Sequence, residues 1–157
     1  MSNTIHTPLM QFLADQNIEF RLLPHQRPAT TIEDAAQQRG IRPSQMVKAI
    51  LLRDMGNQYA LACAPGDRSV DPKKVRALLQ CRRMTCVAQA DVEAITGYKI
   101  GTVTPLLLKR YMPIVFDPSL LEEKEITISS GDRMAGLALS IDDLIQLCQP
   151  TMADICR

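Results

Sequence analysis

Short runs of hydrophobic residues alternate with polar turn residues along this chain, a pattern that predicts a mixture of helices and strands. Apolar residues at helical spacing predict helices over residues 7–16, 30–40, 71–79, 91–96 and 140–148. Compact apolar runs bounded by turn residues predict strands over residues 18–23, 46–53, 58–64, 83–88, 112–116, 125–129 and 134–139. This order of elements predicts an α/β or α+β domain, too irregular for a doubly wound nucleotide-binding fold.

Start signals support three of the predicted helices. The tetrad Thr30-Thr31-Ile32-Glu33 matches a capping box, in which Thr30 caps the helix and Glu33 reaches back to it. Asp71-Pro72 places a capping carboxylate before a proline at the first helical position. Ser140 is expected to cap the last helix in the same way.

The run MVKAILLRD, residues 46–54, places a lysine inside a strand that is otherwise apolar. Because side chains alternate along a strand, Lys48 shares a face with Ile50 and Leu52. Both faces are apolar, so the Lys48 ammonium is expected to enter the core or to point into a cavity. There it would interact strongly with a phosphate or an oxyanion, because the local dielectric constant is low. A lysine that extends its ammonium to solvent is the structural alternative.

Length and composition favour one globular domain over residues 1–157, with 46% hydrophobic and 22% charged residues. The 18 lysine and arginine residues nearly balance the 17 acidic ones, so a nucleic acid would have to bind a local basic patch, and no DNA partner is expected. No apolar run approaches the ~20 residues that span a bilayer, so we expect a cytoplasmic protein without membrane contact. The candidate phosphate contacts are Arg76, Arg82, Arg83, Lys109 and Arg110.

The five cysteines include no C-x-x-C pair, and the two histidines do not complete a zinc spacing. We therefore expect neither a metal nor another cofactor. Reduced thiols of a cytosolic protein are the simplest interpretation of the cysteines. A thiol-based enzyme that uses Cys63 or Cys86 is an alternative, which cysteine-selective alkylation would test.

The segment GYKIGTVTP, residues 97–105, is the second feature that points to a site. Its glycines and its proline form a loop that a ligand could approach closely along the backbone. The chain has no G-x-x-x-x-G-K-[ST] motif, and it has no G-x-G-x-x-G motif after a strand. An ATP- or NAD-dependent activity therefore lacks its usual sequence support.

The order of motifs carries more information than any one of them. The ordered set is Thr30/Thr31, Ala35-Ala36, Gly40, Met46–Leu51, Ala62–Asp67, Asp71–Val75, Thr96–Pro105 and Ser129-Ser130-Gly131. It resembles the YbaK family of freestanding aminoacyl-tRNA editing proteins, which are similar to the editing domain inserted in bacterial prolyl-tRNA synthetases. The resemblance runs from about residue 5 to the C-terminus.

The resemblance implies a fold, an activity and partners. The implied fold is a mixed, mainly antiparallel curved sheet or partial barrel of about six to seven strands surrounded by helices. The implied activity is hydrolysis of the ester that joins a wrong amino acid to the 3′ end of a tRNA, most often the tRNA for proline. Mischarged tRNA is then the substrate, prolyl-tRNA synthetase is a candidate partner, and no cofactor is needed.

The resemblance also assigns roles to residues. Lys48 matches the functional lysine of the family and is expected to anchor the terminal adenosine or the ester. Gly101–Pro105 matches the G-x-x-x-P loop, in which Gly101 shapes the backbone and Pro105 fixes the loop. An ester is already activated, so the site must orient water and stabilise an oxyanion, with the substrate's ribose 2′-hydroxyl assisting. The expected substrate-binding residues are Thr31, Tyr98, Thr102, Ser130 and Gly131.

Two departures from the family pattern leave the substrate open. Many relatives have two consecutive glycines where this chain has Gly101-Thr102, and some have an acidic residue where it has Gly136. Discrimination by one methylene is worth only ~1–3 kcal/mol, so single changes alter which amino acid is accepted. Alanine, cysteine, aminobutyrate, serine and threonine therefore all stay candidates. The alternative to an enzyme is a non-catalytic module that holds a tRNA end, another ligand or a protein partner.

Overall fold

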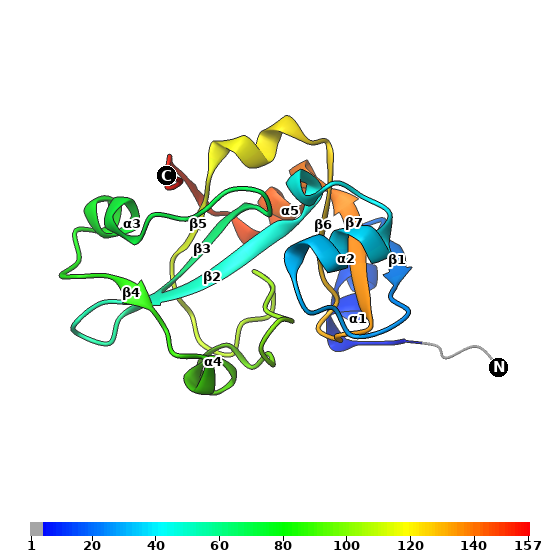
Figure 1. Ribbon diagram of the computed structural model, residues 1–157, viewed down its shortest axis with the longest axis horizontal. Coiled ribbons are helices and arrows are strands. Elements are labelled where there is room, and N and C mark those ends of the chain that lie inside the picture. Colours follow the sequence, from blue (N-terminus) through cyan, green and yellow to red (C-terminus); the bar gives the residue numbers. More distant parts are fainter. Residues whose placement is uncertain (1–4) are drawn as a thin grey trace.

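The computed structural model describes residues 5–157, and within this range the chain forms five α-helices and eight β-strands (Figure 1). The helices are α1 (Pro8–Asp15), α2 (Ile32–Arg39), α3 (Pro72–Leu79), α4 (Gln89–Thr96) and α5 (Ile141–Cys148). The strands are β1 (Arg21–Pro24), β2 (Val47–Arg53), β3 (Tyr59–Pro65), β4 (Thr85–Cys86), β5 (Ile114–Phe116), β6 (Glu125–Ser129), β7 (Ala135–Ser140) and β8 (Thr151–Met152). Short 3-10 turns, η1 (Pro43–Gln45) and η2 (Pro118–Glu122), precede β2 and β6. The mixed α/β class predicted from the sequence is confirmed.

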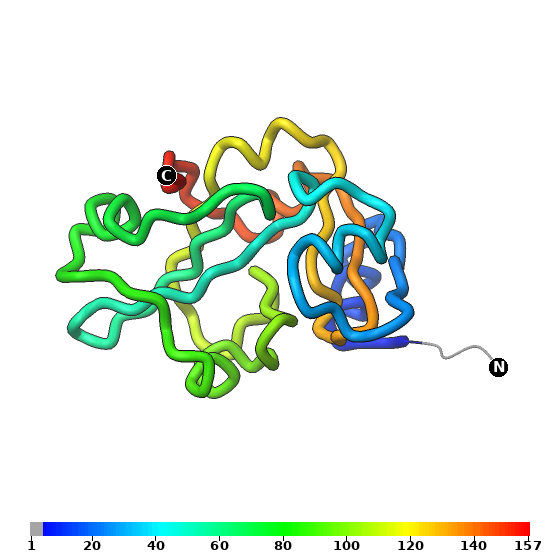
Figure 2. Tube along the Cα trace, in the orientation of Figure 1, coloured from blue at the N-terminus to red at the C-terminus, as the bar shows by residue number. Residues whose placement is uncertain are grey.

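The strands lie in two sheets rather than one, with the orders β1-β7-β6 and β4-β2-β3-β5-β8. All pairs are antiparallel except β3–β5 and β5–β8. A bridge between Met46 and Thr127 joins the start of β2 to β6, so the two sheets meet there. The described strands form a curved, open arrangement without a closed barrel, and the path of the chain through it is traced in Figure 2.

Strand β2 is buried on both faces, as its composition predicts. Leu51 belongs to the main core, which also contains Leu13 of α1, whereas Leu52 packs with Val75 of α3 in a second cluster. The five-stranded sheet is therefore covered on both sides. The predicted hairpin of β2 and β3 is confirmed over its whole length, from Val47 opposite Pro65 to Arg53 opposite Tyr59.

The helix starts follow the sequence signals with one shift. Asp71 and Ser140 cap α3 and α5 as predicted. The cap of α2 is Thr31, whose hydroxyl accepts a hydrogen bond from the Asp34 backbone N–H at 2.9 Å, so the predicted capping box with Thr30 is wrong. The Thr30 backbone N–H instead donates to the Asp34 carboxylate at 3.1 Å. The carboxylate of Asp34, the third residue of α2, therefore accepts the Thr30 N–H in place of the predicted acceptor, Glu33.

Two strands differ most from expectation, while β1 and β5 begin three and two residues later than predicted. The predicted strand over residues 83–88 is reduced to β4, because Arg83 adopts a left-handed backbone conformation (φ 41°) and α4 already begins at Gln89. Strand β8 was not predicted, because two residues carry no readable alternation.

No helix within residues 5–157 is long and apolar enough to cross a membrane. The predicted single domain also includes residues 1–4, which lie outside the described residues.

Candidate functional site

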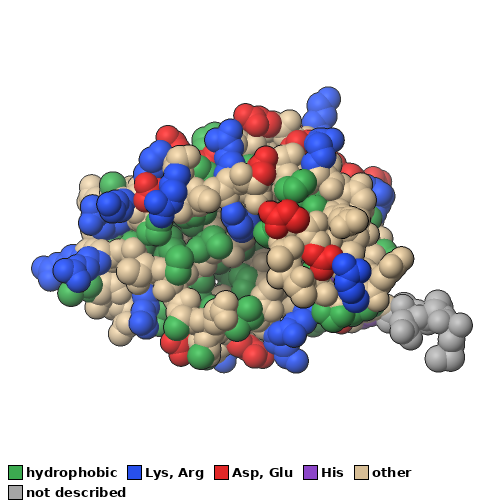
Figure 3. All heavy atoms as spheres, in the orientation of Figure 1, with side chains coloured by type: hydrophobic (Ala, Val, Ile, Leu, Met, Phe, Trp, Pro, Cys, Tyr) green, Lys and Arg blue, Asp and Glu red, His purple; other side chains and the backbone are tan. Residues whose placement is uncertain are grey.

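A cavity of about 570 Å³ lies where α2, the start of β2, the 97–105 segment and the β6–β7 turn come together. Its lining includes two of the predicted site residues, Thr31 and Gly101. Hydrophobic side chains line a hollow near the middle of the face seen in Figure 3. The other lining residues are His25, Pro28, Ala29, Thr30, Ile32, Ala35, Arg39, Met46, Ile100, Ser129, Asp132 and Arg133.

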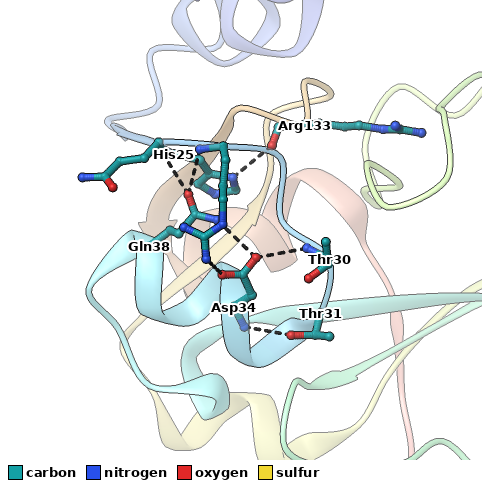
Figure 4. A network of polar contacts seen from close by, with 8 residues as sticks. His25, Thr30, Thr31, Asp34, Gln38 and Arg133 are labelled. Carbon is teal, nitrogen blue, oxygen red and sulfur yellow. Dashed lines mark hydrogen bonds and ion pairs between the residues drawn. The ribbon is translucent and has the colours of Figure 1, made fainter.

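Asp34 holds the chain segment that forms one wall of this cavity (Figure 4). Its carboxylate accepts hydrogen bonds from Arg27 Nη2 at 2.6 Å, from the Thr30 backbone N–H at 3.1 Å and from Gln38 Nε2 at 3.3 Å. These contacts fix the residues that lead into α2. The Thr31 hydroxyl accepts the Asp34 N–H as a helix cap, so its own hydrogen is still available for a ligand.

The buried His25 and the partly buried Arg39 form a hydrogen-bonded pair in the same wall. Arg39 Nε donates to His25 Nε2 at 3.0 Å, and His25 Nδ1 lies 2.9 Å from the Arg133 carbonyl oxygen. A guanidinium can only donate and a carbonyl can only accept, so the imidazole is neutral with its hydrogen on Nδ1. Burial, followed by the Arg39 charge, lowers the pKa of His25 and stabilises this neutral state.

Arg39 is a largely buried cation whose partners are neutral. Its Nη1 donates to Thr127 Oγ1 at 3.0 Å, and burial lowers its pKa to about 10. None of the described carboxylates lies within 4 Å of its guanidinium. Sequence reasoning missed His25, Asp34 and Arg39. The contact of Arg39 with Thr127 spans 88 residues, and no local pattern reports a contact of that separation.

Lys48 lies beside this cavity rather than in its lining. It shares the predicted strand face with Ile50 and Leu52, but its ammonium donates to the backbone carbonyl of Arg68 at the edge of the sheet. The prediction that the ammonium enters the core or a cavity is therefore wrong, because the segment after β3 provides an acceptor and the side chain is only half-buried. Met46, two residues earlier on the same face of the strand, does line the cavity, so Lys48 follows directly after the part of the chain that forms the cavity wall.

The 97–105 segment and the β6–β7 turn touch through two predicted residues. The Tyr98 ring lies 3.5 Å from the position that a Cβ on Gly131 would take. The Tyr98 hydroxyl donates to the Leu106 carbonyl, and burial raises its pKa to about 12. The Tyr98 hydroxyl is therefore neutral and links the 97–105 segment to Leu106. The Tyr98 ring packs against the β6–β7 turn at Gly131.

Gly101 presents backbone to the cavity. Its φ of 83° is left-handed, and a Cβ built there would meet no atom within 4 Å. A side chain at this position would be strained although space is available. The segment thus exposes peptide groups that a ligand can approach closely.

The other predicted residues support the loops from within. The buried Thr102 hydroxyl donates to the Lys99 carbonyl at 2.7 Å, and the buried Ser130 hydroxyl donates to the Ala135 carbonyl at 2.8 Å. The Pro105 carbonyl accepts from Cys148 Sγ at 3.2 Å, beside a different cavity. None of these three residues lines the cavity of Thr31 and Gly101.

The cysteines are all free, and none is part of this site. Cys63 is fully buried, and burial raises the pKa of its thiol well above the usual value. A neutral, inaccessible thiol is a poor nucleophile, which counts against the thiol-enzyme alternative for Cys63. Within residues 5–157 no group of three or more His, Cys, Asp or Glu side chains is placed to hold a metal ion.

Solved structures share this fold along nearly the whole chain. The hypothetical protein APE2540 matches with a TM-score of 0.87 at 25% identity, over 95% of this chain and 99% of that one. A structure titled "putative trans-editing enzyme for prolyl tRNA synthetase" matches with a TM-score of 0.85 at 21% identity, over 98% of this chain and 99% of that one. The fold is therefore that of the YbaK-like trans-editing proteins.

The family model for the aminoacyl-tRNA editing domain matches residues 26–147, and the chain belongs to this family. The resemblance inferred from the order of motifs is thereby confirmed.

Curated relatives agree with this membership. The uncharacterized protein YwhH of Bacillus subtilis is 27% identical over 82% of both chains. The "Putative Cys-tRNA(Pro)/Cys-tRNA(Cys) deacylase EbsC" of Enterococcus faecalis is 24% identical over 78% of this chain and 75% of that protein. The proline–tRNA ligase of Bacillus licheniformis is 34% identical over 59% of this chain, which covers only 16% of the ligase.

Proposed function

We propose that this chain is an aminoacyl-tRNA deacylase that acts in trans on mischarged tRNA, with tRNA for proline carrying alanine or cysteine as the first candidate substrate. The observation that carries the proposal is the cavity between α2 and the 97–105 segment, in a chain of the editing-domain family. The exposed backbone at Gly101 and the Thr31 hydroxyl supply polar groups to a pocket whose lining mixes apolar side chains with polar and charged ones.

Hydrolysis of an aminoacyl ester requires few catalytic side chains from the protein. Water adds to the carbonyl carbon of the ester, the bond to the ribose oxygen breaks, and the 3′-hydroxyl leaves with a proton. The ribose 2′-hydroxyl of the substrate assists the water, while a peptide N–H of the 97–105 segment stabilises the oxyanion. Lys48 anchors the tRNA end after exchanging the Arg68 carbonyl for a phosphate or ribose oxygen.

Specificity is proposed to follow from the size of the cavity. The pocket excludes larger acyl groups, and each methylene contributes ~1–3 kcal/mol of discrimination. Thr102 acts indirectly, because its hydroxyl is bonded within its own turn. A synthetase such as prolyl-tRNA synthetase is proposed as the partner that supplies the tRNA.

The test is deacylation of tRNA for proline charged with alanine, cysteine, serine, threonine or proline. Wild type is expected to release one mischarged amino acid selectively, and Lys48→Ala is expected to lose this activity while keeping its fold. Lys73→Ala, which removes an exposed lysine of α3, is the matched control and should retain activity. If no ester is cleaved faster than its spontaneous rate, the proposal fails and a non-catalytic binding module takes its place.

A further inference from the structure

Tyr111 is the most exposed large hydrophobic side chain of the described residues, with 94% of its surface accessible, whereas the next, Met55, has 65%. A single exposed tyrosine would need no explanation. The residues around Tyr111, however, carry aromatic, cationic and carboxamide groups that have no role in the proposed deacylation.

A second cavity of about 350 Å³ lies beside Tyr111, with Asn57, Gln58, Tyr59 and Arg110 in its lining. The Arg110 guanidinium lies over the Tyr59 ring, with Cζ 5.2 Å from the ring centroid, so a cation–π contact positions it beside the cavity. An aromatic ring, a guanidinium and two carboxamides are the groups with which proteins stack an unpaired base and read its edges.

The charge around this cavity is positive. The side chains of Arg82, Arg83 and Lys109 are exposed, as is that of Arg110, and none of the four has a carboxylate within 4 Å among the described residues. The neighbouring Asp54 carboxylate is occupied by the backbone N–H groups of Gly56 and Gln58. Lys and Arg side chains gather at the end of the molecule formed by α3 and its connection to β4 (Figure 3). This distribution complements an anionic partner, and the aromatic and carboxamide groups beside it favour the phosphates and bases of a nucleic acid.

The same irregular chain segment connects the two cavities. Ile100 and Gly101 line the first cavity, and Arg110 and Tyr111 line the second. The two sites cannot lie more than about 35 Å apart, because an extended chain gains at most ~3.5 Å per residue. The segment is anchored between them by the Lys109 N–H, which donates to the Thr96 carbonyl at 3.0 Å. An RNA whose end occupies the first cavity needs to extend by no more than this distance to contact the second one.

We propose that Tyr111 is the stacking platform for an unpaired nucleotide of an RNA. Asn57 and Gln58 contact the edge of the base, and the four cations contact its flanking phosphates. The identification of this RNA as the tRNA substrate rests on the proposed function. This surface would bind a part of the RNA away from the ester. The near-neutral charge of the whole chain would not by itself attract that part of the RNA.

The test measures binding of uncharged tRNA by fluorescence anisotropy at several salt concentrations, so it does not depend on catalysis. Tyr111→Ala is expected to weaken binding by roughly 5- to 100-fold, the range of one lost base stack, while Tyr111→Phe keeps wild-type affinity. Arg110→Gln is expected to reduce the slope of log affinity against log salt by about one contact. Leu121→Ala, which truncates another exposed apolar residue, is the control and should change nothing.

The outcomes separate this inference from the proposed function. Loss of binding in Tyr111→Ala without any deacylation by wild type would support the RNA surface and refute the enzyme. Deacylation with unchanged KM and affinity in Tyr111→Ala would refute the surface and leave the enzyme. The inference is also overturned if wild type binds no RNA, as a protein-docking surface would behave, or if Tyr111→Phe is as weak as Tyr111→Ala. Because the side chain is almost fully exposed, the variants are expected to fold, which thermal unfolding checks.

Discussion

The guanidinium of Arg39 occupies the space that a side chain on Gly136 would need. A Cβ built at residue 136 would lie 2.3 Å from Arg39 Nε and 2.4 Å from Cζ, closer than real Cβ contacts allow. The glycine thus lets a charged side chain of α2 cross β7 and reach Thr127 on β6. Gly136, where the sequence led us to expect a departure from the family pattern, thus packs directly against Arg39 in this chain.

Gly136→Ala is therefore expected to reduce the free energy of unfolding by about 1–3 kcal/mol, as overpacking of a well-packed site does. Urea denaturation measures the effect. Gly56→Ala is the control, because its Cβ would meet nothing closer than an Asp54 oxygen at 3.5 Å, and it should change stability by less than about 0.5 kcal/mol.

A double-mutant cycle identifies the cause of this loss. In an Arg39→Ala background the clash is absent, so Gly136→Ala should cost less than in wild type by more than about 0.5 kcal/mol. An equal cost in both backgrounds would show that the backbone at residue 136, rather than Arg39, is responsible.

Stability is expected to fall as the pH decreases below about 6.5 because of His25. Its pKa is lowered in the folded state by burial and by Arg39, so the unfolded chain binds a proton at a higher pH than the folded chain does. The free energy of unfolding attributable to His25 is then fully present above the unfolded pKa and decreases between the unfolded and the folded pKa. Protonation would also remove the acceptor of Arg39 Nε.

Urea denaturation at several pH values between 5 and 8 checks this dependence, where the range brackets the histidine pKa. His25→Gln should be less stable at pH 8 and should show a flatter dependence below pH 6.5. The same substitution at His6 controls for the loss of one histidine. A slope that persists unchanged in His25→Gln would assign the pH dependence to another group.

The sequence predicted those features that depend on local pattern. The two apolar faces of β2 and the cap of α3 by Asp71 follow from alternation and spacing over a few residues. The position of the Lys48 ammonium could not be predicted, because its acceptor is a carbonyl of a segment 20 residues further on. The pair of His25 and Arg39 was missed for the same reason, since each residue alone has the sequence context of an ordinary surface residue.

Thr31→Ala is expected to destabilise the fold by ~1 kcal/mol through loss of the α2 cap, whether or not Thr31 also contacts substrate. Thr31→Ser should retain the cap and the stability. Thr30→Ala is the matched control, because the Thr30 contact with Asp34 uses the backbone N–H and survives the substitution. Circular dichroism during thermal unfolding measures all three variants. A larger loss for Thr30→Ala than for Thr31→Ala would restore the capping box predicted from the sequence.

Two buried threonines of the 97–105 segment are expected to respond oppositely to the same substitution. The Thr104 hydroxyl oxygen is buried and has no hydrogen-bond partner among the described residues, whereas the Thr102 hydroxyl donates to Lys99 at 2.7 Å. Replacing an unsatisfied hydroxyl with a methyl group removes a desolvation cost, so Thr104→Val should be neutral or stabilising. Thr102→Val leaves the turn without its hydrogen bond and should cost about 1 kcal/mol. Urea denaturation measures the free energy of unfolding of both variants, which replace a hydroxyl with a methyl group of similar size. A similar loss of stability in both would mean that the Thr104 hydroxyl also has a hydrogen-bond partner in solution.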